Sequence, residues 1–205
     1  MRQDLKNLFF RSLPWIIPVL VGVMVYIYWP YTPRTMSVVV VEEPEQRMLT
    51  GEAPWVKKGY VITPLAAFSI RAKVLHTRQY RWDRGAELSP IDLALGWGLM
   101  SDPRLLEKIT IEQSNRWYFW RYDEPLPINN EYIIAHSANM HMIPANDEVR
   151  ALLLSARPNE IVSLNGYLVK VVANDGYTWA SSLSRTDTGA GSCELVWVEN
   201  ASIEK

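Results

Sequence analysis

Alternation of apolar and polar residues predicts a β-strand in the segment AFSIRAKVLHTRQYRW, residues 67–82. Successive side chains of a strand point to opposite faces, so a period of two divides such a segment into two rows. One row would hold Phe68, Ile70, Ala72, Val74 and His76, and the other Ser69, Arg71 and Lys73. The first row is mostly apolar and the second is polar, which indicates one face in the core and one in water.

Further strands are predicted where β-branched and aromatic residues gather. They are expected at residues 37–41, 60–62, 116–122, 131–136, 159–173, 177–183 and 193–199. Asn174, Asp175 and Gly176 stand between two of these segments and are typical of a tight hairpin turn. Strands therefore outnumber helices along the chain.

Helix signals appear in three places. A Ser89-Pro90 pair precedes the run SPIDLALGWGLM, and Asp92 would lie in the first turn, as expected for a helix start. The pair Asp102-Pro103 repeats this arrangement before a second short helix, and Asn146 is suited to cap a third. Because the helices would be inserts among strands, we predict one α+β domain with a partly closed sheet or small barrel.

The N-terminal region contains the longest uncharged run, LPWIIPVLVGVMVYIYW, residues 13–29. A bilayer-spanning helix needs roughly 20 apolar residues, so this run is near the lower limit of length. The segment after it, YIYWPYTPRT, lacks the small residues that precede signal-peptide cleavage. The sequence therefore favours a retained transmembrane helix over a cleaved signal peptide.

The charges beside this run predict its orientation. Basic Arg2, Lys6 and Arg11 precede the run, whereas the acidic Glu42 and Glu43 follow it. Positively charged flanks remain in the cytoplasm. We therefore predict a single-pass protein of the bacterial inner (cytoplasmic) membrane. Its parts would be a cytoplasmic N-terminus (1–12), a transmembrane helix (13–29), a linker (30–36) and a periplasmic or extracytoplasmic domain (37–205).

Composition narrows the classes of partner. The 205 residues carry a formal net charge of -1, which gives no overall attraction to a polyanion, so no nucleic acid partner is expected. Cys193 is the only cysteine, which excludes an internal disulfide and a multi-cysteine zinc site. The membrane and an envelope protein are the expected partners.

The stretch HSANMHMIPA contains His136 and His141, five positions apart, with methionines beside them. On a helix this offset separates the two side chains by about 140°, and on a strand it places them on opposite faces. They could meet at a copper or haem site only through a local turn, with His76 as a third ligand. The alternative is a strand end whose histidines bond locally. The sequence favours this alternative, and no cofactor is expected.

The tetrapeptide DTGA begins at Asp187 and resembles the catalytic motif of aspartic proteases. Those enzymes share one proton between two aspartates, so a chain with one such motif would act as a dimer. The residues before Asp187 are polar here, whereas the family has apolar residues. The alternative is a glycine-containing loop between two strands. Asp187, His136 and His141 are the catalytic candidates.

The run RWYFWRY, residues 116–122, is the strongest candidate for a binding surface. A strand would place its arginines and aromatic rings on two faces, and such residues often bind partner side chains or sugars. The alternative is a strand buried on both faces. The binding candidates are Trp97, Arg116, Trp117, Trp120 and Arg121.

Four segments together resemble a group of uncharacterised bacterial single-pass membrane-anchored proteins of unknown function. They are SPIDLALGWGLMSD, QSNRWYFWR, HSANMHMIPA and NGYLVKV...GYTWASSLSRTDTGAGSCELVWVE. The resemblance implies the domain boundaries and adds no chemistry. We expect a membrane-anchored envelope binding or assembly module rather than an enzyme. The alternatives are an envelope hydrolase of aspartic or histidine type and a metal- or haem-binding protein.

Overall fold

The computed structural model describes residues 38–123 and 125–204, and these form mostly β-structure, with 47% strand and 14% helix. The strands are β1 (Glu45–Met48), β2 (Trp55–Lys57), β3 (Tyr60–Gln79), β4 (Ile91–Gly96), β5 (Thr110–Ser114), β6 (Trp117–Arg121), β7 (Ser137–Pro144), β8 (Ile161–Ala173), β9 (Thr178–Ala180) and β10 (Glu194–Glu204). The helical segments are η1 (Gly98–Ser101), α2 (Pro103–Leu106), α3 (Asn130–His136) and α4 (Asp147–Ser155). The predicted α+β class is therefore wrong, because the helices are too short to form a layer of their own.

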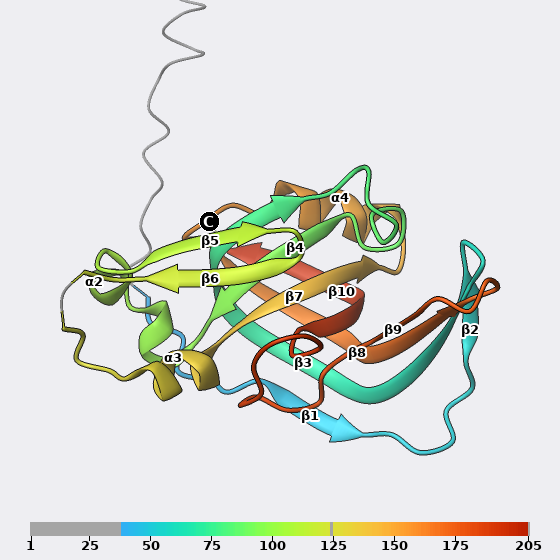
Figure 1. Cartoon of the computed structure of the whole chain (residues 1–205), viewed down its shortest axis with the longest axis horizontal. Helices are drawn as coiled ribbons and strands as arrows, with labels where there is room; N and C mark the ends of the chain where they lie inside the picture. Colours follow the sequence, from blue (N-terminus) through green and yellow to red (C-terminus); the bar gives the residue numbers. More distant parts are fainter. Residues whose placement is uncertain (1–37, 124, 205) are drawn as a thin grey trace, which may run out of the picture. The chain divides into compact units, whose positions relative to one another are not determined.

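The main sheet closes on itself in the part of the chain that the structure describes. Its path runs β3-β4-β7-β10-β8, and β8 pairs again with β3, as Figure 1 shows. The β7–β10 pair is parallel, and the other pairs on this path are antiparallel. Helix α4 lies between β7 and β8 in the chain. This strand order and the place of the helix are those of a small Greek-key barrel of the OB type.

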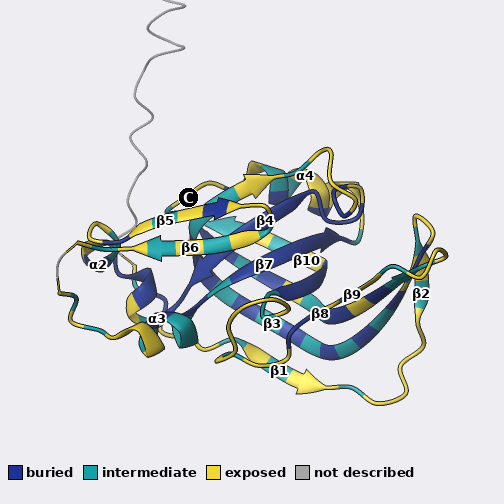
Figure 2. Cartoon of the chain, in the orientation of Figure 1, coloured by how far each residue is buried: buried dark blue, intermediate teal, exposed yellow. Residues whose placement is uncertain are grey.

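The long strand β3 can join both sides of the barrel because it is interrupted by two irregularities. Its pairing register shifts between Pro64 and Ala66 opposite β8, and between Val74 and His76 opposite β4. A proline has no N–H to donate, so it is tolerated at such a bulge. The predicted alternation is confirmed as far as Ala72, and Figure 2 shows buried and partly buried positions succeeding one another along β3. Lys73, which was expected on the water-facing row, is buried.

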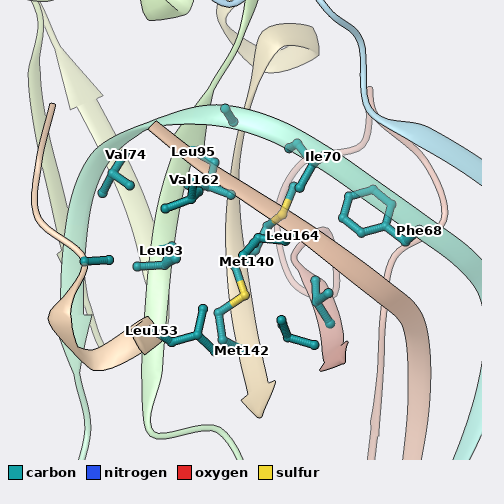
Figure 3. Close-up of a cluster of buried hydrophobic side chains, with 14 of the residues drawn as sticks. Phe68, Ile70, Val74, Leu93, Leu95, Met140, Met142, Leu153, Val162 and Leu164 are labelled. Atoms are coloured by element: carbon teal, nitrogen blue, oxygen red, sulfur yellow. The ribbon is translucent and has the colours of Figure 1, made fainter. Parts of the chain in front are cut away.

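The larger of two hydrophobic clusters in the barrel is shown in Figure 3, where its side chains converge from several strands. Met140 and Met142 of β7 are fully buried in it, beside Leu93 and Leu95 of β4. Helix α4 covers one end of the barrel and adds Leu153 to the same cluster. Asn146 caps α4 as predicted, because its side-chain oxygen accepts from the Val149 N–H at 2.9 Å.

Two predicted elements are of the wrong type. The segment after Ser89 is the strand β4, not a helix, because all six residues of β4 are buried between β3 and β7. A strand buried on both faces has a continuous apolar run, so it lacks the alternation by which strands are recognised. The strand expected at residues 131–136 is the helix α3, and Asn129 caps it by accepting from the Tyr132 N–H. The strand expected at residues 37–41 is absent from its described part, residues 38–41.

The prediction of a single-pass membrane protein is also corrected. In residues 38–123 and 125–204, no helix is both long enough and apolar enough to cross a bilayer. The predicted transmembrane helix, residues 13–29, and the segments on either side of it, 1–12 and 30–36, lie outside the described residues. The described residues therefore show no inner-membrane anchor, and the predicted localisation with a periplasmic domain is not supported.

A large insert between β4 and β7 consists of η1, α2, the β5–β6 hairpin and α3. A small core of its own joins these elements, formed by the buried Met100, Leu105, Ile109 and Ile133. The hairpin lies across the outer face of β4 and β7 (Figure 1). That face of the barrel is therefore covered by protein.

Candidate functional site

The β5–β6 hairpin is built on a tight turn at Asn115 and Arg116. Both residues have positive φ angles, 50° and 69°, which gives the two-residue turn whose twist suits the flanking strands. Ser114 and Trp117 pair across the turn, and β6 continues to Arg121. The aromatic strand predicted at residues 116–122 is therefore confirmed, although its first residue, Arg116, belongs to the turn.

Arg116 fastens this turn to the barrel. Its guanidinium lies 2.6 Å from Asp92 Oδ1, 2.9 Å from Asp83 Oδ1 and 3.0 Å from the Ser89 carbonyl oxygen. The same group stacks 3.7 Å from the ring centroid of Tyr80. Asp92 is fully buried and has lost the stabilisation of its charge by water. The positive charge of Arg116 compensates for this loss.

Further polar contacts join the inner face of the hairpin to the barrel. Asn139 donates to the Arg116 carbonyl oxygen at 3.1 Å and accepts from Gln113. His76 contacts the Gln113 side chain at 2.9 Å. The Tyr118 hydroxyl donates to Ser137 at 3.0 Å, and burial raises the pKa of Tyr118 to about 12. The hairpin is thus positioned by hydrogen bonds along its length.

A groove of about 390 Å³ lies beside this hairpin. One wall is β6, the floor is the end of α3 with the start of β7, and the opposite wall is the loop between β9 and β10. The lining residues are Trp117, Tyr118, Phe119, Trp120, Ile134, Ser137, Ala138, Asn139, Ser184, Arg185, Asp187, Thr188, Gly189, Ser192, Cys193 and Glu194. Three elements that are distant in sequence therefore form one site.

The two walls of the groove differ in chemistry. On β6, Trp117 is 44% exposed and Phe119 is 50% exposed, so two large apolar side chains face water. On the opposite wall, Arg185 Nη1 donates to Glu194 Oε1 at 2.6 Å. Asp187 Oδ2 accepts from the Ser182 hydroxyl at 2.7 Å. The site can therefore offer both apolar contact and polar groups to a ligand.

Burial controls the ionisation of two groups in the groove. Desolvation raises the pKa of the Glu194 carboxyl to about 7, although Arg185 acts against the shift. Desolvation also raises the pKa of the Cys193 thiol to about 11, with the Asn139 side chain opposing it. A thiol with this pKa is protonated at neutral pH and is a poor nucleophile.

The structure separates the five predicted binding residues. Trp97 is fully buried, and its indole N–H donates to Glu43 at 2.7 Å. Arg116 is bound to the barrel as described above, and Arg121 pairs with Glu112 on the exposed face of the hairpin. Trp117 and Trp120 line the groove. Two of the five thus belong to the candidate site.

The catalytic candidate Asp187 also lines the groove, but its surroundings are not those of a shared-proton pair. Its carboxylate accepts the Ser182 hydroxyl, whereas the other carboxyl group lining this groove, Glu194, is bound to Arg185. The loop around Asp187 holds positive φ angles at Gly189 and Gly191. The DTGA segment therefore has the geometry of a turn between two strands.

The three histidines contact different groups. His76 contacts Gln113, and the His136 ring stacks on Tyr132 with 3.7 Å between ring centroids. His141 Nδ1 lies 2.9 Å from Asp92 Oδ1, but the two atoms do not form a hydrogen bond. Among the described residues, no group of three or more His, Cys, Asp or Glu side chains is arranged to hold a metal ion. The structure does not bring the histidines together.

Several groove residues were not identified from the sequence. Tyr118 and Phe119 belong to the aromatic run that was singled out, so their presence had a signal. Ile134, Arg185 and Glu194 had none, because only the fold brings α3, β6 and β10 side by side.

A wider hollow of about 860 Å³ lies between the β3–β4 loop and the β8–β9 turn. Its lining includes Arg81, Arg84, Glu87 and Asp175, and Arg84 pairs with Asp175. Trp82, in the same loop, is 95% exposed. This hollow is more open and more charged than the groove.

No family model, no curated protein and no solved structure matches this chain.

Proposed function

We propose that this protein is a binding module that holds a segment of a partner protein in the groove beside β6. The observation that carries the proposal is the pair of exposed aromatic side chains, Trp117 and Phe119, on a wall of a hollow that also contains polar groups. Its volume of about 390 Å³ falls within the range of ligand pockets, roughly 300–1,000 Å³.

The composition and support of the groove favour a protein partner. Aromatic residues are enriched at the cores of protein interfaces, and tryptophan is among the residues whose loss weakens binding most. Trp117 directly follows the turn that Arg116 fastens to Asp92, so β6 is held in place before a partner arrives. A preorganised surface loses less entropy on binding.

The ionisation states in the groove support binding more than hydrolysis. Cys193 is protonated at neutral pH, and Glu194 is paired with Arg185. Asp187 accepts a hydrogen bond from the Ser182 hydroxyl of its own loop. A nucleophile needs a free lone pair and a neighbouring base. These side chains instead stabilise the loop that forms the second wall.

A selection from random peptides tests this function. The immobilised full-length chain would be presented with a phage-displayed library of random nonapeptides, and enriched peptides would be synthesised for affinity measurement. We expect Trp117→Ala and Phe119→Ala each to weaken their binding at least about tenfold, because each removes an aromatic contact.

The matched control is Trp82→Ala, which removes an exposed tryptophan outside the groove. It should leave the affinity unchanged, and circular dichroism should show all three variants folded. Failure to enrich any peptide, or equal loss with Trp82→Ala, would contradict the proposed function.

A further inference from the structure

The edge of β6 that borders the groove is a strand edge without a neighbouring strand. In the described part of the chain, β5 and β6 form a two-stranded sheet, so β6 pairs on one side alone. In Figure 1, β5 follows one edge of β6, and β7 and the β9–β10 loop lie on its other side. Tyr118 and Trp120 of this strand both line the groove.

The hairpin turn decides which backbone groups point into the groove. In a two-residue hairpin the closing pair, here Ser114 and Trp117, exchanges hydrogen bonds across the two strands. Hydrogen-bonded pairs alternate with non-hydrogen-bonded pairs, so Phe119 also bonds to β5. The N–H and C=O groups of Tyr118 and Trp120 therefore point away from β5. Among the described residues, none of these four groups has a hydrogen-bond partner.

We infer that the groove takes its partner as an added β-strand, hydrogen-bonded to the free edge of β6. This inference rests on the proposed function and specifies the chemistry of the ligand. An extended polypeptide presents alternating donors and acceptors that match a strand edge, and this mode of recognition uses main-chain bonds for affinity. The ligand is therefore an extended peptide segment of a partner protein.

The opposite wall restricts the ligand to a single segment. The loop between β9 and β10, with Ser184 and Asp187, lines the groove across from β6. A single added strand lies about 4.8 Å from the strand with which it pairs. A partner that paired through the edge of its own sheet would bring further strands beyond the first. The loop lines the side of the groove on which further strands would have to lie. We therefore assign the groove to a short extended segment rather than to a second copy of the hairpin.

Side chains of the added strand would alternate between two environments. One set would point to the floor, which contains Ile134 and Ala138. The other set would lie beside Trp117 and Phe119 on the outer face. Because β6 has five residues, the matching segment is about five residues long, roughly 17 Å at 3.4 Å per residue. Apolar residues at alternate positions are expected in the ligand.

Backbone methylation of the ligand tests the inference. The nonapeptides selected on the full-length chain would be resynthesised with one N-methyl group at each amide in turn. Methylation removes a donor while the side chain is kept. We expect at least a tenfold loss of affinity at alternate amides of the bound segment and little change at those between them, because an added strand bonds through every second residue.

The matching experiment on the protein replaces single amides by esters. A hydroxy-acid analogue at Tyr118 removes the N–H that points into the groove and keeps the phenol ring. Affinity for the selected peptides should fall at least about fivefold. The same replacement at Trp82 should change nothing. On peptide binding, the amides of Tyr118 and Trp120 should become protected from hydrogen exchange.

The outcomes separate the inference from the function beneath it. If peptides bind and depend on Trp117 and Phe119, but methylation shows no alternation and the Tyr118 ester has no effect, strand addition is wrong and the binding function remains. If no peptide binds through the groove, both are wrong. Alternating losses with protection of the Tyr118 and Trp120 amides would establish the added strand.

Discussion

At the scale of single residues, Glu194 shows how burial sets chemistry in this protein. The side chain is buried at the start of β10, where Arg185 donates to Oε1 and Oε2 has no hydrogen-bond partner among the described residues. Removing a carboxylate from water disfavours its charge, and here this effect exceeds the attraction of Arg185, so the pKa rises to about 7. The group therefore changes charge close to neutral pH.

This ionisation predicts a pH dependence of stability. Below about pH 4.5 Glu194 is protonated in both the folded and the unfolded chain. Between about pH 4.5 and pH 7 the folded chain holds a proton that the unfolded chain has lost, so the free energy of unfolding falls as the pH rises. The decrease is on the order of 3 kcal/mol.

Chemical denaturation at several pH values, compared with Glu194→Gln, measures this contribution. Glutamine keeps an oxygen for Arg185 and cannot ionise, so the variant should gain stability relative to the wild type as the pH rises. A constant difference between the two proteins from pH 4.5 to pH 7.5 would show that Glu194 does not titrate as expected.

Among the elements, the β5–β6 hairpin has its turn anchored to the barrel by a buried ion pair. Arg116 lies in a turn, yet its side chain is only 17% exposed and contacts a fully buried Asp92. Loss of one partner leaves the other charged and buried, which is costly. The hairpin is thus positioned by a contact with the barrel as well as by its own pairing.

Substitution of this arginine should release the hairpin. We expect Arg116→Ala to lower the free energy of unfolding by about 3–5 kcal/mol, because the buried Asp92 then loses its arginine partner. Hydrogen exchange should become faster along β5 and β6. The matched control is Arg121→Ala on the same hairpin, whose exposed pair with Glu112 should contribute less than about 1 kcal/mol. Equal effects of the two substitutions would contradict the anchoring role of Arg116.

At the scale of the whole molecule, closure of the barrel brings three strands together at Gly166. This residue of β8 pairs with Phe68 of β3 on one side and with Val198 of β10 on the other. A β-carbon at this position would lie 1.9 Å from the Trp197 carbonyl oxygen, which belongs to the backbone. The strands can approach closely here only because the residue is glycine.

The substitution Gly166→Ala should therefore destabilise the whole barrel. We expect a loss of at least about 2 kcal/mol, because a backbone contact cannot be relieved by turning a side chain. Thermal denaturation would measure it, with Gly51→Ala as the control. That glycine has a positive φ and open space around it, so its substitution should cost about 1–2 kcal/mol through backbone strain alone. A Gly166→Ala protein as stable as the control would show that the β8–β10 contact can relax.

Local signals in the sequence were sufficient for some elements. The alternation from Phe68 to Ala72, the cap at Asn146 and the turn at Gly176 all appear in the structure as predicted. Each depends on neighbouring residues or on the alternation of a surface strand, which a sequence displays directly. The same reasoning identified Trp117 and Trp120, because their aromatic run is unusual at any position.

Other features depended on contacts between distant segments. The strand β4 was read as a helix because a capping pattern precedes it, whereas pairing with β3 and β7 outweighs that local preference. The incorrect α+β class arose in part from counting this strand as a helix. The groove also lacked a sequence signal, because its walls come from β6 and from a loop near Glu194, more than sixty residues later in the chain.

Local patterns along the chain were enough to indicate which segments alternate, where several helices and turns begin, and that one aromatic run is unusual. Closure of the barrel, burial of Met140 and Met142 in its core, and the contact of Arg116 with the barrel all arise from the folded chain. They could not be predicted locally because burial and pairing depend on which distant segments meet. A local pattern specifies the conformation a segment prefers, and the contacts of the folded chain decide whether that preference is kept.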